Sequence, residues 1–88
     1  MASYKIILQS QADKTYQWLF RHDRPLHARI RSALLILQMD PHAGKALRGP
    51  WQGTWSFRVG VYRILYRIER NILTIVVLDI GHRREIYR

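Results

Sequence analysis

Two arginines at facing positions of an expected β-hairpin are the first residues in this sequence that could do chemistry. In residues 55–66, WSFRVGVYRILY, Gly60-Val61 suits a two-residue turn, because glycine fits the first central position of a type II′ turn. Folding two strands about this turn sets Arg58 directly opposite Arg63. Like charges at opposed positions destabilise a sheet. The pair therefore predicts a site that is built for a phosphate.

Further cations are expected to gather around this pair. Side chains alternate between the faces of a strand, so Arg58, Arg63 and then Arg67 lie on one face, and the apolar alternate residues lie on the other. The last strand would bring His82 and Arg83 to the same end of the sheet if it pairs beside residues 61–68. A Gly-rich loop would bring in Lys45 and Arg48. We expect a concave basic surface with no carboxylate inside it.

The overall charge agrees with an anionic partner. Fifteen Lys and Arg face six Asp and Glu, which gives a formal net charge of +9, and all but Lys5, Lys14 and Lys45 of these bases are Arg. Arginine binds phosphate through a planar fork and also stacks on bases. This excess favours a nucleic acid as partner. An acidic protein partner for a basic surface is the alternative.

The elements that must position these residues begin with a strand and two helices. Residues 4–8 are apolar and β-prone, which predicts a first strand. Ser10 is the expected N-cap of a helix that runs through Phe20. Asp23 is the expected cap of a second helix, with Pro25 in its first turn, and residues 40–41 (Asp-Pro) end that helix. The short connection predicts a helical hairpin.

The second half of the chain predicts a loop and three strands. Residues 41–53 hold two Pro and three Gly and read as a loop, and residues 54–59, 61–68 and 72–80 read as strands, with residues 69–71 as a turn. Short turns make the three strands an antiparallel meander. The chain is therefore expected to be a single α+β domain over residues 1–88: an N-terminal strand, a helical hairpin and an antiparallel β-meander, with the helices on one sheet face.

Composition excludes several classes of protein. The chain has no cysteine, which rules out disulfides and thiolate metal sites. Its apolar runs are far shorter than a membrane span, and residues 1–10 lack the apolar segment of a signal peptide. We therefore expect a soluble cytoplasmic protein that does not use a membrane, a metal or a cofactor.

Three motifs in order resemble the RelE-type toxins of the RelE/ParE toxin superfamily. They are residues 47–49 (LRG), residues 55–66 with R-x-G-x-YRxxY at their centre, and residues 78–87 (LDIGHRREIY). The order of strand, helices and sheet also agrees, so the resemblance covers essentially the whole chain.

The resemblance implies the toxin of a type II toxin–antitoxin system. Such a toxin would enter the ribosomal A site and cut mRNA there, with the RNA's own 2′-hydroxyl attacking the adjacent phosphorus. The products would be a 2′,3′-cyclic phosphate and a 5′-hydroxyl, and no metal would be needed. The implied partners are a cognate antitoxin, the ribosome with its 16S rRNA, and mRNA.

The resemblance also implies roles for individual residues. Arg63 matches a phosphate-contacting arginine, Arg58 a basic residue on the preceding strand, Arg83 an arginine near the leaving oxygen, and Tyr87 a terminal tyrosine that stacks on the substrate nucleotide. Ser56 departs from one variant of the family, which has a second lysine there. Proton transfer then falls to His82, Tyr87 or Lys45, an alternative that stays open. The remaining RNA contacts are expected from Lys45, Arg48, Arg67 and Arg84.

Two other functions compete with the nuclease. A ParE-like toxin on the same fold would bind DNA gyrase and would have no nuclease site, and fold alone does not separate the two. The set of Arg58, Arg63, Arg83 and Tyr87 favours the nuclease. The other alternative is an inactive nucleic-acid-binding module.

Overall fold

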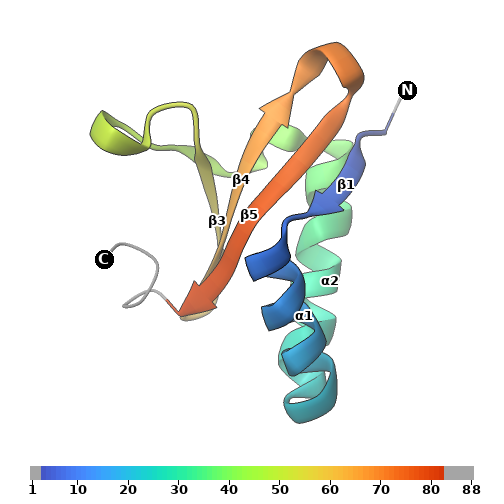
Figure 1. Cartoon of the computed structure of the whole chain (residues 1–88). Helices are drawn as coiled ribbons and strands as arrows, with labels where there is room; N and C mark the ends of the chain where they lie inside the picture. The colour runs from blue at the N-terminus through green and yellow to red at the C-terminus, as the bar shows by residue number, and fades with distance from the viewer. Residues whose placement is uncertain (1–2, 83–88) are drawn as a thin grey trace.

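Five strands form one mixed sheet, and two helices pack on one of its faces (Figure 1). The computed structural model describes residues 3–82. The strand order is β1-β5-β4-β3-β2, with β1 parallel to β5 and all other pairs antiparallel. The strands are β1 (Lys5–Leu8), β2 (Lys45–Ala46), β3 (Trp55–Val59), β4 (Tyr62–Glu69) and β5 (Thr74–His82). The predicted α+β class and the β3-β4-β5 meander are confirmed.

The helical hairpin consists of α1 (Ser10–His22) and α2 (Arg24–Met39). Asp23 caps α2 as predicted, because its side-chain oxygen accepts a hydrogen bond from the Leu26 N–H at 3.1 Å. The predicted cap of α1 is wrong by one residue. Gln9 is the N-cap there, without a side-chain cap bond, and Ser10 is already helical. No helix in the described part of the chain is long and apolar enough to cross a membrane.

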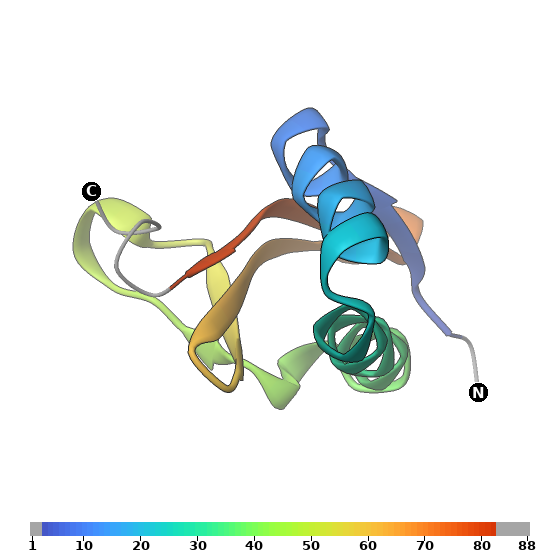
Figure 2. The ribbon, with the colours of Figure 1, turned by 90° about the horizontal axis from the view of Figure 1, so that it is seen from below.

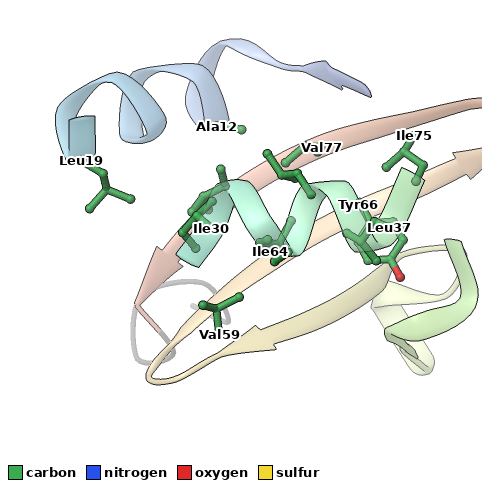
Figure 3. Close-up of a cluster of buried hydrophobic side chains, with 12 residues drawn as sticks. Ala12, Leu19, Ile30, Leu37, Val59, Ile64, Tyr66, Ile75 and Val77 are labelled. Atoms are coloured by element: carbon green, nitrogen blue, oxygen red, sulfur yellow. The ribbon is translucent and has the colours of Figure 1, made fainter. Parts of the chain in front are cut away.

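The core lies between the helices and the sheet (Figure 3). Helix α1 contributes Ala12 and Leu19, and α2 contributes a stripe with Ile30 and Leu37. The sheet supplies the apolar face predicted for the hairpin: Val59, Ile64 and Tyr66 are buried, and Trp55, Phe57 and Tyr62 pack partly buried against them. Two views at right angles place the helical hairpin and the loop before β3 at opposite sides of the molecule (Figures 1 and 2).

The predicted hairpin register is confirmed at every pair. Val59 lies opposite Tyr62 and Arg58 opposite Arg63. Gly60 has φ 61°, the value that a type II′ turn requires at its first central position. Strand β5 pairs beside β4, as expected, but with a bulge. Because of the bulge, Leu65 faces Asp79 while Tyr66 faces Val77.

Residues 41–53 are more ordered than the loop that their Pro and Gly predicted. They form two 3-10 turns, η1 (Pro41–Ala43) and η2 (Gly49–Trp51), with strand β2 between them. Strand β2 was not predicted, because a segment of two residues is too short to show an alternation of apolar and polar side chains. Strand β5 also begins at Thr74 and not at Ile72, since η3 (Arg70–Ile72) and Leu73, whose φ is 48°, extend the turn.

Candidate active site

Three cations line one cavity on the sheet face opposite the helices. Lys45 of β2, Arg58 of β3 and Arg63 of β4 surround about 460 Å³, together with Ala43, Gly44, Ser56 and Phe57. The register explains the grouping, because Lys45 pairs with Ser56 and Arg58 pairs with Arg63 across neighbouring strands. The predicted convergence of these three residues is therefore seen.

The two arginines differ in their surroundings. Arg58 is exposed, and its Nε–H donates a hydrogen bond to the Gly60 carbonyl at 3.2 Å. Arg63 is half-buried. Two guanidinium groups on directly opposed residues make the electrostatic potential of the cavity more positive. An anion that binds between them would relieve their repulsion. Arginine's fixed fork of donors suits a phosphate oxygen pair.

A buried tyrosine holds the wall of the cavity in place. The Tyr66 hydroxyl donates to the Pro41 carbonyl at 2.7 Å and accepts from the Gly44 N–H at 3.1 Å. Gly44 is needed for this close approach, since a Cβ there would meet the Tyr66 hydroxyl and lie 2.9 Å from the Ser56 carbonyl. Burial raises the pKa of Tyr66 to about 12. Tyr66 therefore positions the segment that presents Lys45.

The His82 side chain is not part of the lining of the arginine cavity. It reaches the expected end of the sheet, but it pairs with Tyr62, and its ring makes an edge contact with the Tyr62 ring at a centroid distance of 6.0 Å. The side chain of Tyr62 packs toward the helices. In the same strand Gly81, and not His82, lies opposite Arg63. The expectation that His82 joins the arginine cluster is therefore not supported.

The basic face carries two carboxylates that the prediction left out. Arg67 lies on this face as expected, but its Nε is 3.5 Å from the Glu69 Oε1, and both side chains are about half exposed. Asp79 lies on the same face, diagonal to Arg63, because the β-bulge places it opposite Leu65. Neither carboxylate lines the cavity. The prediction of a carboxylate-free cluster thus holds for the cavity lining but is wrong for the face as a whole.

The remaining predicted site residues are not gathered here. Arg48 is exposed and precedes η2, outside the lining of the cavity. Arg83, Arg84 and Tyr87 lie outside the described residues. Among residues 3–82, no group of three or more His, Cys, Asp or Glu could hold a metal ion. The sequence did not predict the two hydrogen bonds that the Tyr66 hydroxyl makes. Their only sign in the sequence was a polar hydroxyl on an otherwise apolar strand face.

Comparisons with known proteins identify the family of this chain. A protein-family model described as the ParE toxin of the type II toxin–antitoxin system parDE matches residues 6–87. Toxin RelG of Mycobacterium tuberculosis is 44% identical over 66 residues, which is 74% of this chain and 76% of RelG.

Solved structures show the same fold. The RelBE2 toxin–antitoxin complex from Mycobacterium tuberculosis contains a chain that is 34% identical, with a TM-score of 0.78 over 91% of this chain and 98% of that one. The YoeB/ParE toxin from Agrobacterium tumefaciens is 22% identical, with a TM-score of 0.80 over 89% and 96% of the two chains, and supports the fold alone. This chain therefore belongs to the ParE toxin family within the RelE/ParE superfamily of type II toxin–antitoxin toxins.

Proposed function

We propose that this toxin is a ribosome-dependent, metal-independent endonuclease that cuts mRNA in the ribosomal A site. The observation that carries the proposal is the cavity that Lys45, Arg58 and Arg63 line. Three cations from three neighbouring strands make an anion site that a purely gyrase-binding toxin does not need. The 44% identity to a toxin named RelG supports the same choice.

The proposed cleavage needs no reactant besides the RNA itself. The 2′-hydroxyl oxygen attacks the adjacent phosphorus as its proton leaves, the bond from phosphorus to the 5′-oxygen breaks, and that oxygen takes up a proton. Negative charge develops on the non-bridging phosphate oxygens, where Arg58 and Arg63 would stabilise it. Preorganised donors of this kind account for about 100- to 1,000-fold in rate each. Arg83 would lie near the leaving oxygen, and Tyr87 would stack on a substrate base.

Lysine 45 is our choice for a proton-transfer role within the described residues. The contact of His82 with Tyr62 argues against a part for that histidine in the cavity. Arginine stays protonated in proteins, so Arg58 and Arg63 serve as electrostatic groups and not as bases. Lysine is among the side chains that carry protons in acid–base catalysis, and Lys45 lines the cavity together with both arginines. Tyr87 remains the second proposed proton carrier.

The proposed partners follow from the charge and from the relatives. A cognate antitoxin is expected for a toxin of a type II system, and the RelBE2 structure is a toxin–antitoxin complex. The bases Arg48 and Arg67, which are exposed, would contact mRNA or 16S rRNA, and so would Arg84. The site of action would be the cytoplasm, where the ribosomes are.

Cleavage of a translated message tests the proposal. Purified ribosomes are given an mRNA and the toxin, and primer extension maps new 5′ ends. We expect cuts only when ribosomes are present and EDTA-treated toxin to retain activity. Arg58→Gln should abolish the cuts, whereas Arg31→Gln, which removes an exposed arginine of α2, should not. Full cleavage by Arg58→Gln would reject this site.

A ParE-like action on gyrase is the second candidate, because the matching family model is that of a ParE toxin. It predicts inhibition of DNA supercoiling by purified gyrase and no cuts in mRNA. The same protein preparation distinguishes the two functions when both assays are run in parallel.

A further inference from the structure

The backbone that carries Lys45 is held at the surface by a histidine outside the candidate active site. We call residues 41–46 the Lys45 segment; it comprises η1, Gly44 and strand β2. On its buried side the segment is bound by the Tyr66 hydroxyl. On its exposed side the Arg70 Nη2 lies 2.9 Å from the His42 Nε2. The segment is therefore fixed from both sides.

The contact with Arg70 defines the protonation state of His42. Arginine has donors only, so the His42 Nε2 accepts this hydrogen bond and the ring proton lies on Nδ1. A protonated ring would have no acceptor and would set a second positive charge against the guanidinium. The contact therefore exists only while the histidine is neutral.

Two further contacts connect His42 to the cavity. Its ring packs edge-on against the Trp55 ring at a centroid distance of 5.1 Å, and Trp55 pairs with Ala46 across β2 and β3. The preceding residue, Lys45, pairs with Ser56, and both of these residues line the cavity. A displacement of the His42 ring would therefore act on the backbone that presents Lys45.

We propose that neutral His42, bound by Arg70, is a positioning residue for Lys45, and that protonation of His42 in mild acid moves Lys45 out of the geometry for cleavage. The effect on cleavage rests on the proposed function, whereas the loosening of the Lys45 segment does not. Histidine is the side chain that ordinarily takes up a proton between about pH 8 and 5. A misplacement of about 1 Å in an active site can cost about 100-fold in rate.

Several other ionisable groups lie on the elements around His42. They are Asp40 at the end of α2, Lys45 on β2, Arg58 on β3, Tyr66 on β4, and Glu69 and Arg70 where β4 ends. Burial raises the pKa of Tyr66 to about 12, and arginines stay charged, so these groups keep their state between about pH 5 and 8. A pH response that His42→Gln abolishes therefore belongs to His42 and not to Asp40, Lys45 or Glu69.

Hydrogen exchange of the full-length toxin tests the loosening without any cleavage. The Gly44 N–H, which donates to the Tyr66 hydroxyl, reports on the Lys45 segment. The Gln9 N–H, which donates to the Val77 carbonyl, is the control at the opposite edge of the sheet. From about pH 7.5 to 5.5 the protection factor of the Gly44 N–H should fall about two- to tenfold, as for the loss of one hydrogen bond, and that of the Gln9 N–H should not.

The pH profile of single-turnover cleavage on the ribosome tests the consequence. The parent rate should fall at least about tenfold further between pH 7.5 and 5.5 than the rate of His42→Gln, whose amide oxygen still accepts from Arg70 at either pH. Arg70→Gln should also reduce the acid loss, because protonated His42 then meets no cation. His22→Gln is the matched control and should keep the parental profile, since His22 contacts the Trp18 ring on α1.

Equal pH profiles for the parent and His42→Gln would overturn the proposal. Protection of the Gly44 N–H that does not respond to pH, or that responds equally in His42→Gln, would overturn it as well. If neither the parent nor any variant cleaves mRNA at any pH, the proposed function fails. The exchange measurement then still decides whether His42 controls the Lys45 segment, so the two failures are distinguishable.

Discussion

Arg58 and Arg63 are held opposite each other by backbone pairing that the apolar face of the hairpin enforces. A shift of one residue in register would send Ile64 and Tyr66, both fully buried, to the other face. The core thus fixes the register, and the register fixes the arginines. Their repulsion is a local cost of about 1 kcal/mol or less, which is small beside the burial of two large side chains. Functional sites commonly break a local stability rule in this way.

Replacing Arg63 should separate stability from activity. Arg63→Gln relieves the repulsion with Arg58 but also removes the contacts of a half-buried side chain, so we expect the free energy of unfolding to change by less than about 1 kcal/mol. Cleavage on the ribosome should fall about 100- to 1,000-fold. A thermal melt beside a single-turnover cleavage assay measures both. An unfolded variant would make Arg63 a structural residue, and a folded variant with normal cleavage would reject its catalytic role.

The free energy of unfolding should decrease at alkaline pH because the folded state raises the pKa of Tyr66. Its pKa is about 12 in the folded chain, chiefly because of burial, against 10.0 for an unperturbed tyrosine. The folded state therefore holds the proton more tightly than the unfolded state. The stabilisation is complete below pH 10 and is lost as the pH rises through about 12, with a total near 3 kcal/mol. Burial also raises the pKa of Tyr16, which adds in the same direction.

Urea denaturation between pH 8 and 12 measures this loss, and Tyr66→Phe is the matched variant. The Tyr66→Phe substitution should lower the free energy of unfolding at pH 8 by about 1–3 kcal/mol, because the Pro41 carbonyl and the Gly44 N–H lose their hydrogen-bond partner. It should also show a weaker dependence on pH above 10. A pH profile identical to that of the parent would show that Tyr66 does not carry the effect.

Among the elements, those with strong local signals were predictable from the sequence and those fixed by distant contacts were not. The meander and α2 each have a clear apolar period or cap, and both are confirmed. The two-residue strand β2 exists because the Tyr66 hydroxyl holds the preceding segment against β3. The position of His82 could not be predicted, because a bulge in β5 reverses the alternation of side chains after Val77 and sets His82 opposite Tyr62. A bulge of this kind has no signature in the local sequence.

Loss of the α2 cap should destabilise the fold without harming the site. Asp23→Ala removes the side-chain acceptor of the Leu26 N–H and should lower the free energy of unfolding by about 0.5–2 kcal/mol. Ser10→Ala should have a smaller effect, because Ser10 lies inside α1 and does not cap it. Denaturant titrations of both variants give the comparison, with cleavage expected at the parental rate below the melting range. Equal destabilisation would contradict the assignment of the caps.

For the molecule as a whole, charge sets the strength of RNA binding and its dependence on salt. The candidate site presents three cations, and each phosphate they neutralise on a single strand contributes a slope of about −0.7 to the log–log salt dependence. Three such contacts give a slope near −2, or a loss of about 20-fold in affinity between 50 and 200 mM salt.

A short RNA with a 2′-deoxy sugar at the cleavage position measures binding without reaction. Arg58→Gln should reduce the steepness by about 0.7, whereas Arg31→Gln should not, since that exposed arginine of α2 does not line the cavity. An unchanged slope in Arg58→Gln, or a flat salt dependence in the parent, would show that RNA does not bind through these cations.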